Sequence, residues 1–214
     1  MFSKQTREGG ETIRQDITII AGLAVFLIFS VFTLTSIALF PDGFSPFENW
    51  ISDLGNSEYN PSGSMIFNIG CMITGISMAL FFIGLKRHYT TEKNKRNMTL
   101  TLAMGLFSSF SLIMIGIFSE DYPQEHTLWS GIFFVALIIF MILANITLMK
   151  HKGFFKPIGY YAFVIIMLDL ALIVTKVMGM KVPILEWLTV FASIIWILLL
   201  AYNIHIGKPS VHQA

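Results

Sequence analysis

Long apolar segments recur along the chain and alternate with short polar connections. Six segments reach about 20 mostly apolar residues, the length that a helix needs to cross a bilayer. They are 17–40, 62–85, 98–118, 127–149, 157–179 and 185–206. All seven prolines lie between these segments or at their ends, as expected for helices, because proline interrupts a helix interior. The pattern predicts an all-α integral membrane protein in which residues 1–214 form a single domain, a six-transmembrane-helix bundle.

Composition agrees with this class. Only 13% of the residues are charged and 55% are hydrophobic, whereas soluble domains carry about 25% charged residues. The net charge of +1 predicts no nucleic-acid partner. A single cysteine, Cys71, excludes an intramolecular disulfide. The first apolar segment is too long for a signal-peptide core, so we expect it to be a retained span.

Charged residues are distributed unevenly among the connections. Of the fourteen lysines and arginines, all except Lys176 and Lys181 fall in the N-terminal segment, the second and fourth connections or the C-terminal tail. Basic residues favour the cytoplasmic side of a membrane. We therefore expect a cell-membrane protein with the N- and C-termini in the cytoplasm. Eight of the thirteen acidic residues then lie on the outer side, where a polar site is expected.

The first outer connection contains a short amphipathic pattern. Ser45 and Glu48 have the spacing of a capping box, and Pro46 suits a first helical position. Apolar residues then recur on one helical face, at Phe47, Trp50, Ile51 and Leu54. We predict a short helix over about 46–54 that lies at the outer membrane interface or dips into it, with a polar side that could close over the outer end of the bundle.

Asp53 falls in the last turn of this predicted helix. A carboxylate there faces the negative end of the helix dipole, at a cost of about 0.3–1 kcal/mol. One interpretation is that a cation, a histidine or a metal compensates. The other is a solvated aspartate on an exposed helix, where the cost is small.

The connection between the third and fourth spans places acidic residues next to a histidine. Glu120 and Asp121 precede His126, which is the one histidine on the predicted outer side. Ser130 follows one helical turn later, on the same face. The imidazole of His126 suits a base, an acid or a metal ligand. The alternative is a short acidic loop with an interfacial histidine.

Several chemistries fit these outer side chains. The candidate catalytic residues are Asp53, Asp121, His126 and Glu186. The candidate metal ligands are Asp53, Asp121 and His126. The cofactor stays unknown: a divalent metal is compatible with these ligands but not required, since zinc sites commonly use more than one histidine, whereas calcium accepts carboxylates and carbonyls. A Ser/His/Asp triad from Ser52 or Ser130 lacks a nucleophile-elbow sequence. The candidate ligand-binding residues are Ser52, Asp53, Asn68, Glu120, Asp121, His126, Ser130 and Glu186.

Asp169 lies near the middle of the fifth span, where a charge costs at least about 2.5–3.5 kcal/mol. Lys176 follows on the same face but about 10 Å along the axis, so direct pairing is not expected. These two residues are candidates for an intramembrane polar site. The alternative is a protonated aspartic acid that bonds to a neighbouring helix, with Asn68, Ser108, Ser109 and Asn145 as available partners.

Several short motifs resemble a known family. They are Ile51-Ser-Asp-Leu-Gly55, Pro61, Phe67-Asn68 with Gly70, Ile117-Phe-Ser-Glu-Asp121, His126, Phe133-Phe134 and Glu186. The set is similar to the prokaryotic six-span membrane family catalogued as domain of unknown function 998, over roughly residues 20–205. Ser119 departs from the proline expected before the acidic pair. The resemblance implies a six-helix membrane fold and a polar outer cluster, and it brings no established reaction.

Three functions remain open at this stage. The first is binding of a lipid headgroup or a small molecule in a polar outer pocket, with membrane lipid as the partner. The second is a membrane-embedded lipid hydrolase with a carboxylate–histidine site. The third is a transporter centred on Asp169, although no span contains the internal proline of a broken helix. The pattern predicts no oligomeric state.

Overall fold

Six long helices form the chain in the computed structural model, which describes residues 2–41 and 43–207, with side chains from residue 16 on. The C-terminal tail 208–214, part of the predicted cytoplasmic side, lies outside the described residues. The elements are α1 (Phe2–Ala38), η1 (Ile51–Gly55), α2 (Ser64–Tyr89), α3 (Lys95–Ile117), α4 (Pro123–Leu148), α5 (Lys156–Val177) and α6 (Pro183–Ile206). Each α-helix contains a segment long and apolar enough to cross a membrane. The predicted all-α, six-span fold is confirmed.

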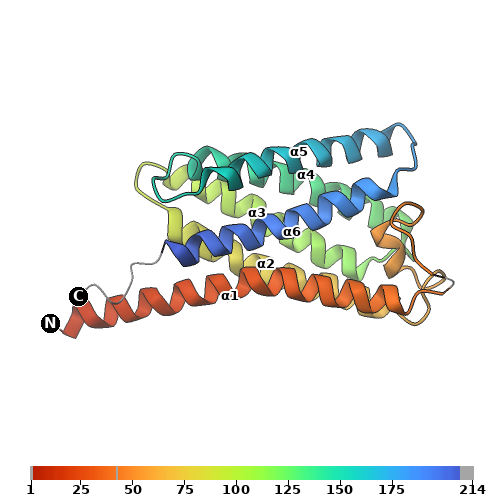
Figure 1. Ribbon diagram of the computed structural model, residues 1–214, viewed down its shortest axis with the longest axis horizontal. Coiled ribbons are helices and arrows are strands. Elements are labelled where there is room, and N and C mark those ends of the chain that lie inside the picture. Colours follow the sequence, from red (N-terminus) through yellow and green to blue (C-terminus); the bar gives the residue numbers. More distant parts are fainter. Residues whose placement is uncertain (1, 42, 208–214) are drawn as a thin grey trace.

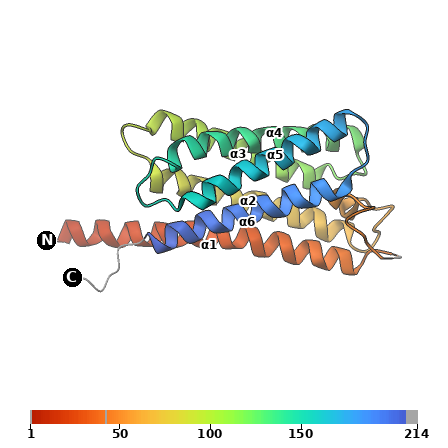
Figure 2. The ribbon, with the colours of Figure 1, turned by 45° about the horizontal axis from the view of Figure 1, so that its top comes forward.

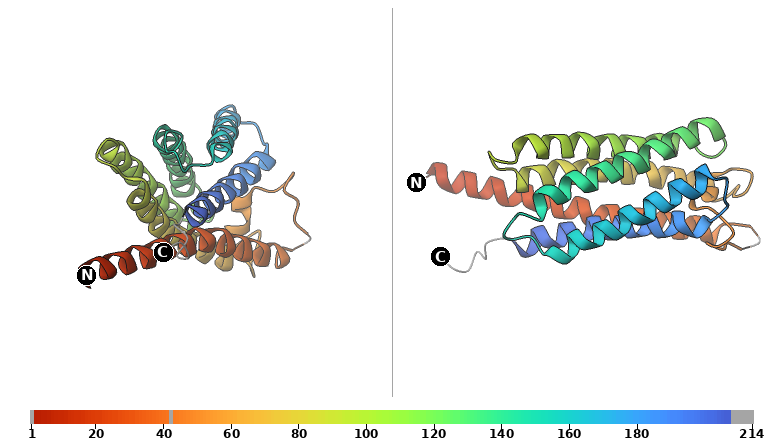
Figure 3. Two further views of the ribbon diagram at one scale, coloured as in Figure 1. Left: turned by 60° about the vertical axis from the view of Figure 1, so that its left-hand side comes forward. Right: turned by 90° about the horizontal axis from the view of Figure 1, so that it is seen from above.

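The helices run lengthwise as a bundle, with consecutive helices antiparallel (Figures 1 and 2). α1 packs on α2 and α6, and α3 packs between α2 and α4. α5 packs mainly on α6 and less on α4, so it lies at the margin of the bundle (Figure 3). The start of α1 and the end of α6 lie at one end of the molecule. We call the opposite end, where the 3-10 helix η1 lies, the η1 end.

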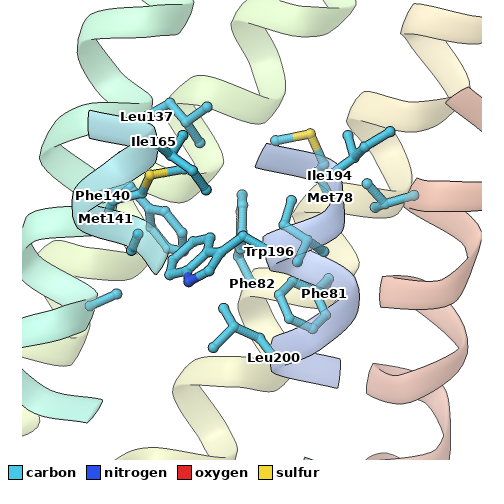
Figure 4. Close-up of a cluster of buried hydrophobic side chains, with 14 of the residues drawn as sticks. Met78, Phe81, Phe82, Leu137, Phe140, Met141, Ile165, Ile194, Trp196 and Leu200 are labelled. Carbon is cyan, nitrogen blue, oxygen red and sulfur yellow. The ribbon is translucent and has the colours of Figure 1, made fainter. Parts of the chain in front are cut away.

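A tryptophan occupies the centre of the apolar core. Trp196 of α6 is fully buried, and its Nε1 donates a hydrogen bond to the carbonyl of Ile158 in α5 at 3.1 Å. Its ring meets Phe140 of α4 edge-on, with centroids 5.9 Å apart, and Phe82 of α2 lies against the same phenylalanine. Figure 4 shows these rings surrounded by leucine, isoleucine and methionine side chains. This cluster connects four helices below the η1 end.

The short helix after the first span differs from its prediction in type and bounds. Residues 46–49 form a turn, and a 3-10 helix then runs from Ile51 to Gly55. All five residues of η1 are buried, while Phe47 of the preceding turn is 73% exposed. The two faces of the amphipathic pattern do not meet different environments, because both faces of η1 are covered by the ends of the long helices. η1 is inserted between the ends of the long helices and does not lie along the membrane interface.

Asn60 holds the connection between η1 and α2 against the end of α1. Its Nδ2 donates to the Ser36 hydroxyl at 2.9 Å and to the Leu54 carbonyl at 3.1 Å, and its Oδ1 accepts from Gly63 N at 3.1 Å. The side chain is fully buried. One amide therefore satisfies polar groups from three segments, which water cannot reach.

Asn60→Ala is expected to lower the free energy of unfolding by about 2 kcal/mol, because it removes the buried hydrogen bonds by which one amide joins Ser36, Leu54 and Gly63. Thermal unfolding in detergent, followed by circular dichroism, measures the change. Asn56→Ala is the matched control, since Asn56 only accepts from the backbone of its own exposed turn. Equal losses in the two variants would contradict the role given to Asn60.

Candidate functional site

Glu186 connects three elements at the η1 end. It lies in the first turn of α6, where a carboxylate is favoured by the helix dipole. Its Oε2 accepts from the backbone N–H of Ile51 at 3.0 Å and lies 3.5 Å from the Ser52 hydroxyl. Its Oε1 accepts from Lys176 Nζ at 3.0 Å. The carboxylate thus joins α6 to η1 and to the end of α5, and it is nearly fully buried.

Lys176 is part of this cluster and not a partner of Asp169. It lies in the last turn of α5, where the dipole favours a cation. Its Nζ lies 4.4 Å from the centroid of the Trp50 ring, a cation–π contact. As expected from their spacing, the two residues do not pair: Lys176 belongs to the η1 end, and Asp169 lies deeper in the bundle.

Asp53 and Glu120 form a pair of carboxyl groups beside Glu186. The two groups lie within hydrogen-bonding reach of each other, and the Ser52 hydroxyl donates to Glu120 Oε1 at 2.7 Å. Burial, and then the negative charge of Glu120, raise the pKa of Asp53 to about 7. At neutral pH the pair therefore retains a proton for much of the time.

The prediction that Asp53 opposes the helix dipole is wrong. Its Oδ2 accepts a hydrogen bond at 2.8 Å from the backbone N–H of Trp50, three residues earlier. The carboxyl group thus turns back to the N-terminus of η1, where an acceptor is favourable. Asp53 caps η1, and no cation is required to compensate it.

His126 lies beside these groups, in the first turn of α4, and is buried. Its Nδ1 is 3.0 Å from the Phe118 carbonyl. Because a carbonyl only accepts, Nδ1 carries the proton, and in the neutral ring Nε2 is left as an acceptor. Nε2 makes no hydrogen bond to any side chain or backbone group in the described part of the chain.

Asp121 does not join this cluster. It is exposed, and it accepts from the backbone N–H and the hydroxyl of Ser57 and from the hydroxyl of Ser119. Partial burial raises the pKa of Asp121, but the hydrogen bonds from both serines outweigh it and lower the pKa overall. Ser119, which replaces the proline expected there, supplies one of these bonds. Asp121 thus connects two loops.

Three further observations concern the other candidate site residues. Asn68 donates to the Gly55 carbonyl at 3.0 Å, so it fixes the end of η1 on α2. Neither Ser52 nor Ser130 bonds to His126 within the described chain, so no Ser/His/Asp triad is formed. Over residues 16–41 and 43–207, no three His, Cys, Asp or Glu side chains form a group that could hold a metal ion.

Asp169 lies apart from the η1 end. It is fully buried in α5, and neither carboxyl oxygen has a hydrogen-bond partner among the described residues. The predicted partners are bonded elsewhere: Asn68 to Gly55, Ser108 and Ser109 to Gly105, and the Asn145 amide nitrogen to Gly159. Asp169 does not line the cavity described next.

An elongated cavity runs from the cluster into the bundle between α1, α2, α3, α4 and α6. Its volume is about 60 Å³, so the cavity is narrow. We call the part at the η1 end, lined by Ser52, His126, Ser130 and Glu186, the polar end. Below it the walls are mostly apolar, including Phe29, Phe67, Phe133, Phe134 and Ile197.

The fold and this cavity define a multi-pass membrane protein with a polar cluster above an apolar chamber. The chain belongs to the family described as proteins of unknown function, DUF998, whose model matches residues 20–203. The resemblance seen in the short motifs is thereby confirmed. Neither a curated protein nor a solved structure matches the chain.

The Lys176–Glu186 pair was not predicted, although a signal for it was present. The two residues flank a short connection between two spans, and a helical hairpin brings such ends together. Gly179, with a φ of 72°, forms the turn in that connection. The contact of Trp50 with Lys176 was not predicted, because the sequence placed Trp50 only on the apolar face of the short helix. The hydroxyls of Thr74 and Ser193, which line the cavity, were not predicted either, because nothing in their local sequence distinguishes them from ordinary membrane-helix residues.

Proposed function

We propose that the protein binds an amphiphilic ligand, with its headgroup at the polar end and an apolar chain in the cavity below. The observation that supports this most directly is that one cavity joins Ser52, His126 and Glu186 to a mostly apolar interior. Binding sites of this kind are concave and apolar with a few convergent polar groups. The narrow apolar part of this space suits a flexible acyl chain.

The charges at the polar end favour a headgroup that donates hydrogen bonds. Lys176 neutralises Glu186, but the carboxyl pair of Asp53 and Glu120, which lies beside Glu186 without lining the cavity, retains a negative charge at neutral pH. A phosphate there would meet like charge, whereas hydroxyl groups would find carboxylate oxygens and His126 Nε2 as acceptors. The distribution of lysine and arginine supports placing this end on the outer side of the cell membrane.

Hydrolysis of the bound lipid is a second candidate, favoured by one observation. Nε2 of His126 is an unpartnered acceptor at the polar end, as a general base requires. No side chain of the described residues is bonded to it as a nucleophile, so water would have to serve. Binding alone needs no such assumption, and we rank it first.

Cys71→Phe tests the proposal by filling the cavity from α2. Cys71 lines the cavity and is 2% exposed. Native mass spectrometry of gently extracted protein is expected to show a retained lipid in the unmodified protein and its loss in the variant, with folding preserved by circular dichroism. Ile73→Phe is the control, because this substitution adds the same ring on the same helix at a position that is 37% exposed.

Retention of lipid by Cys71→Phe, or no lipid in the unmodified protein, would overturn the proposal. A bound fatty acid in place of an intact ester would move hydrolysis to first place.

A further inference from the structure

Two hydroxyl groups deep in the cavity have no partner. Thr74 of α2 is fully buried and Ser193 of α6 is 5% exposed, and both line the cavity. The oxygen of each hydroxyl makes no hydrogen bond within the described chain. A buried hydroxyl without a partner costs about 1–3 kcal/mol. The two groups therefore point to a polar partner that comes from outside the chain.

Other hydroxyls in the same helices behave differently. Ser77 of α2 donates to the carbonyl of Ile73, and Thr189 of α6 donates to that of Glu186. Such bonds to the preceding turn are the ordinary way in which a membrane helix satisfies serine and threonine. Thr33 is also buried and unpartnered, but it does not line the cavity.

Thr74 and Ser193 lie at the same depth. Both α2 and α6 begin at the η1 end, at Ser64 and Pro183, and each hydroxyl comes ten residues after that start. Glu186 comes three residues after the start of α6, as His126 does after the start of α4. With a rise of about 1.5 Å per residue, the two hydroxyls lie about 10 Å below the level of Glu186 and His126.

We infer that the ligand is an ester- or amide-linked lipid with an uncharged, hydroxylated headgroup, whose linkage carbonyl bonds to Thr74 and Ser193. This rests on the proposed function and names the class of its ligand. A carbonyl oxygen has two lone pairs and can accept from both hydroxyls. A spacing of about 10 Å fits a sugar-sized headgroup between the acceptors of the polar end and the linkage. With an uncharged headgroup, no phosphate has to lie against the phenylalanines that line the cavity.

The probes are a glucosyl monoacylglycerol and its analogue with an ether-linked chain of equal length, offered together at equal concentration. The ratio of the two bound lipids is read by native mass spectrometry. The unmodified protein is expected to prefer the ester about tenfold, the effect of one to two hydrogen bonds. The double variant Thr74→Val/Ser193→Ala is expected to bind both probes equally.

Thr33→Val is the control, because it removes a buried, unpartnered hydroxyl outside the cavity, and it is expected to keep the preference. Equal binding of the two probes by the unmodified protein, or a preference that survives in the double variant, would overturn the inference while leaving lipid binding intact. Binding of neither probe would overturn both this inference and the proposed function.

Discussion

Lys176→Met is expected to lower the free energy of unfolding by about 3 kcal/mol, because it leaves the Glu186 carboxylate buried without a counter-charge. The Glu186 side chain is 4% exposed, and its oxygen lies 3.0 Å from the ammonium group. The expected loss lies at the lower end for a buried pair, since the Lys176 side chain is 41% exposed. Thermal unfolding in detergent, followed by circular dichroism, measures the change.

Two comparisons separate this pair from a general effect of losing a lysine. Lys181→Met removes an exposed lysine from the same connection and should change stability by less than about 0.5 kcal/mol. Adding Glu186→Gln to Lys176→Met is expected to recover most of the loss, because a neutral amide can still accept from Ile51 and has no charge to leave unpaired. If the two effects simply added, the pair would not be coupled in this way.

The six spans could be predicted because lipid imposes both a length and a composition on each helix. Their starts were less accurate. The apolar windows begin at 127 and 185, whereas α4 and α6 begin at Pro123 and Pro183. The first turns of these helices contain His126 and Glu186, whose polarity lowers the local hydropathy although the backbone is already helical. Those first turns contribute His126 and Glu186 to the polar end.

The segment 46–54 could not be read correctly from its amphipathic pattern. The pattern assumes that one face meets an apolar environment and the other meets water. Ser52, Asp53 and Leu54 are all buried, because the ends of the long helices surround η1. The path of a loop through the end of a bundle depends on tertiary contacts such as those of Asn60, and these have no local periodicity.

The acidic residues of the predicted outer site lie together at the η1 end, but the sequence did not indicate how their carboxylates pair. From the sequence alone, nothing distinguished Asp53, Asp121 and Glu186 from one another, because each is an acidic residue near a predicted helix end. In the structure Asp121 accepts hydrogen bonds from loop serines, the carboxyl group of Asp53 interacts with that of Glu120, and Glu186 forms an ion pair with Lys176. These choices follow from where two loops cross, which charge patterning alone does not give.

Asp53→Asn is expected to stabilise the protein at pH 8 and to have little effect near pH 4. The folded state raises the pKa of Asp53 from 3.8 to about 7, chiefly through burial. Between these two values the folded chain holds a proton that the unfolded chain has released, so stability falls as the pH rises through this window. Above the folded pKa the loss is complete, and it amounts to at most about 4 kcal/mol.

Asparagine removes this pH dependence without removing the cap of η1, since its side-chain oxygen can still accept from Trp50. The measurement is the unfolding temperature of both proteins in detergent at intervals between pH 4 and pH 8. Asp121→Asn should show the opposite sign, because the pKa of Asp121 is lowered and its carboxylate stabilises the folded state once ionised. Parallel curves for the unmodified protein and Asp53→Asn would mean that Asp53 titrates alike in both states. The carboxyl pair would then carry two full negative charges at neutral pH, and the polar end would favour a cationic headgroup over a neutral, hydroxylated one.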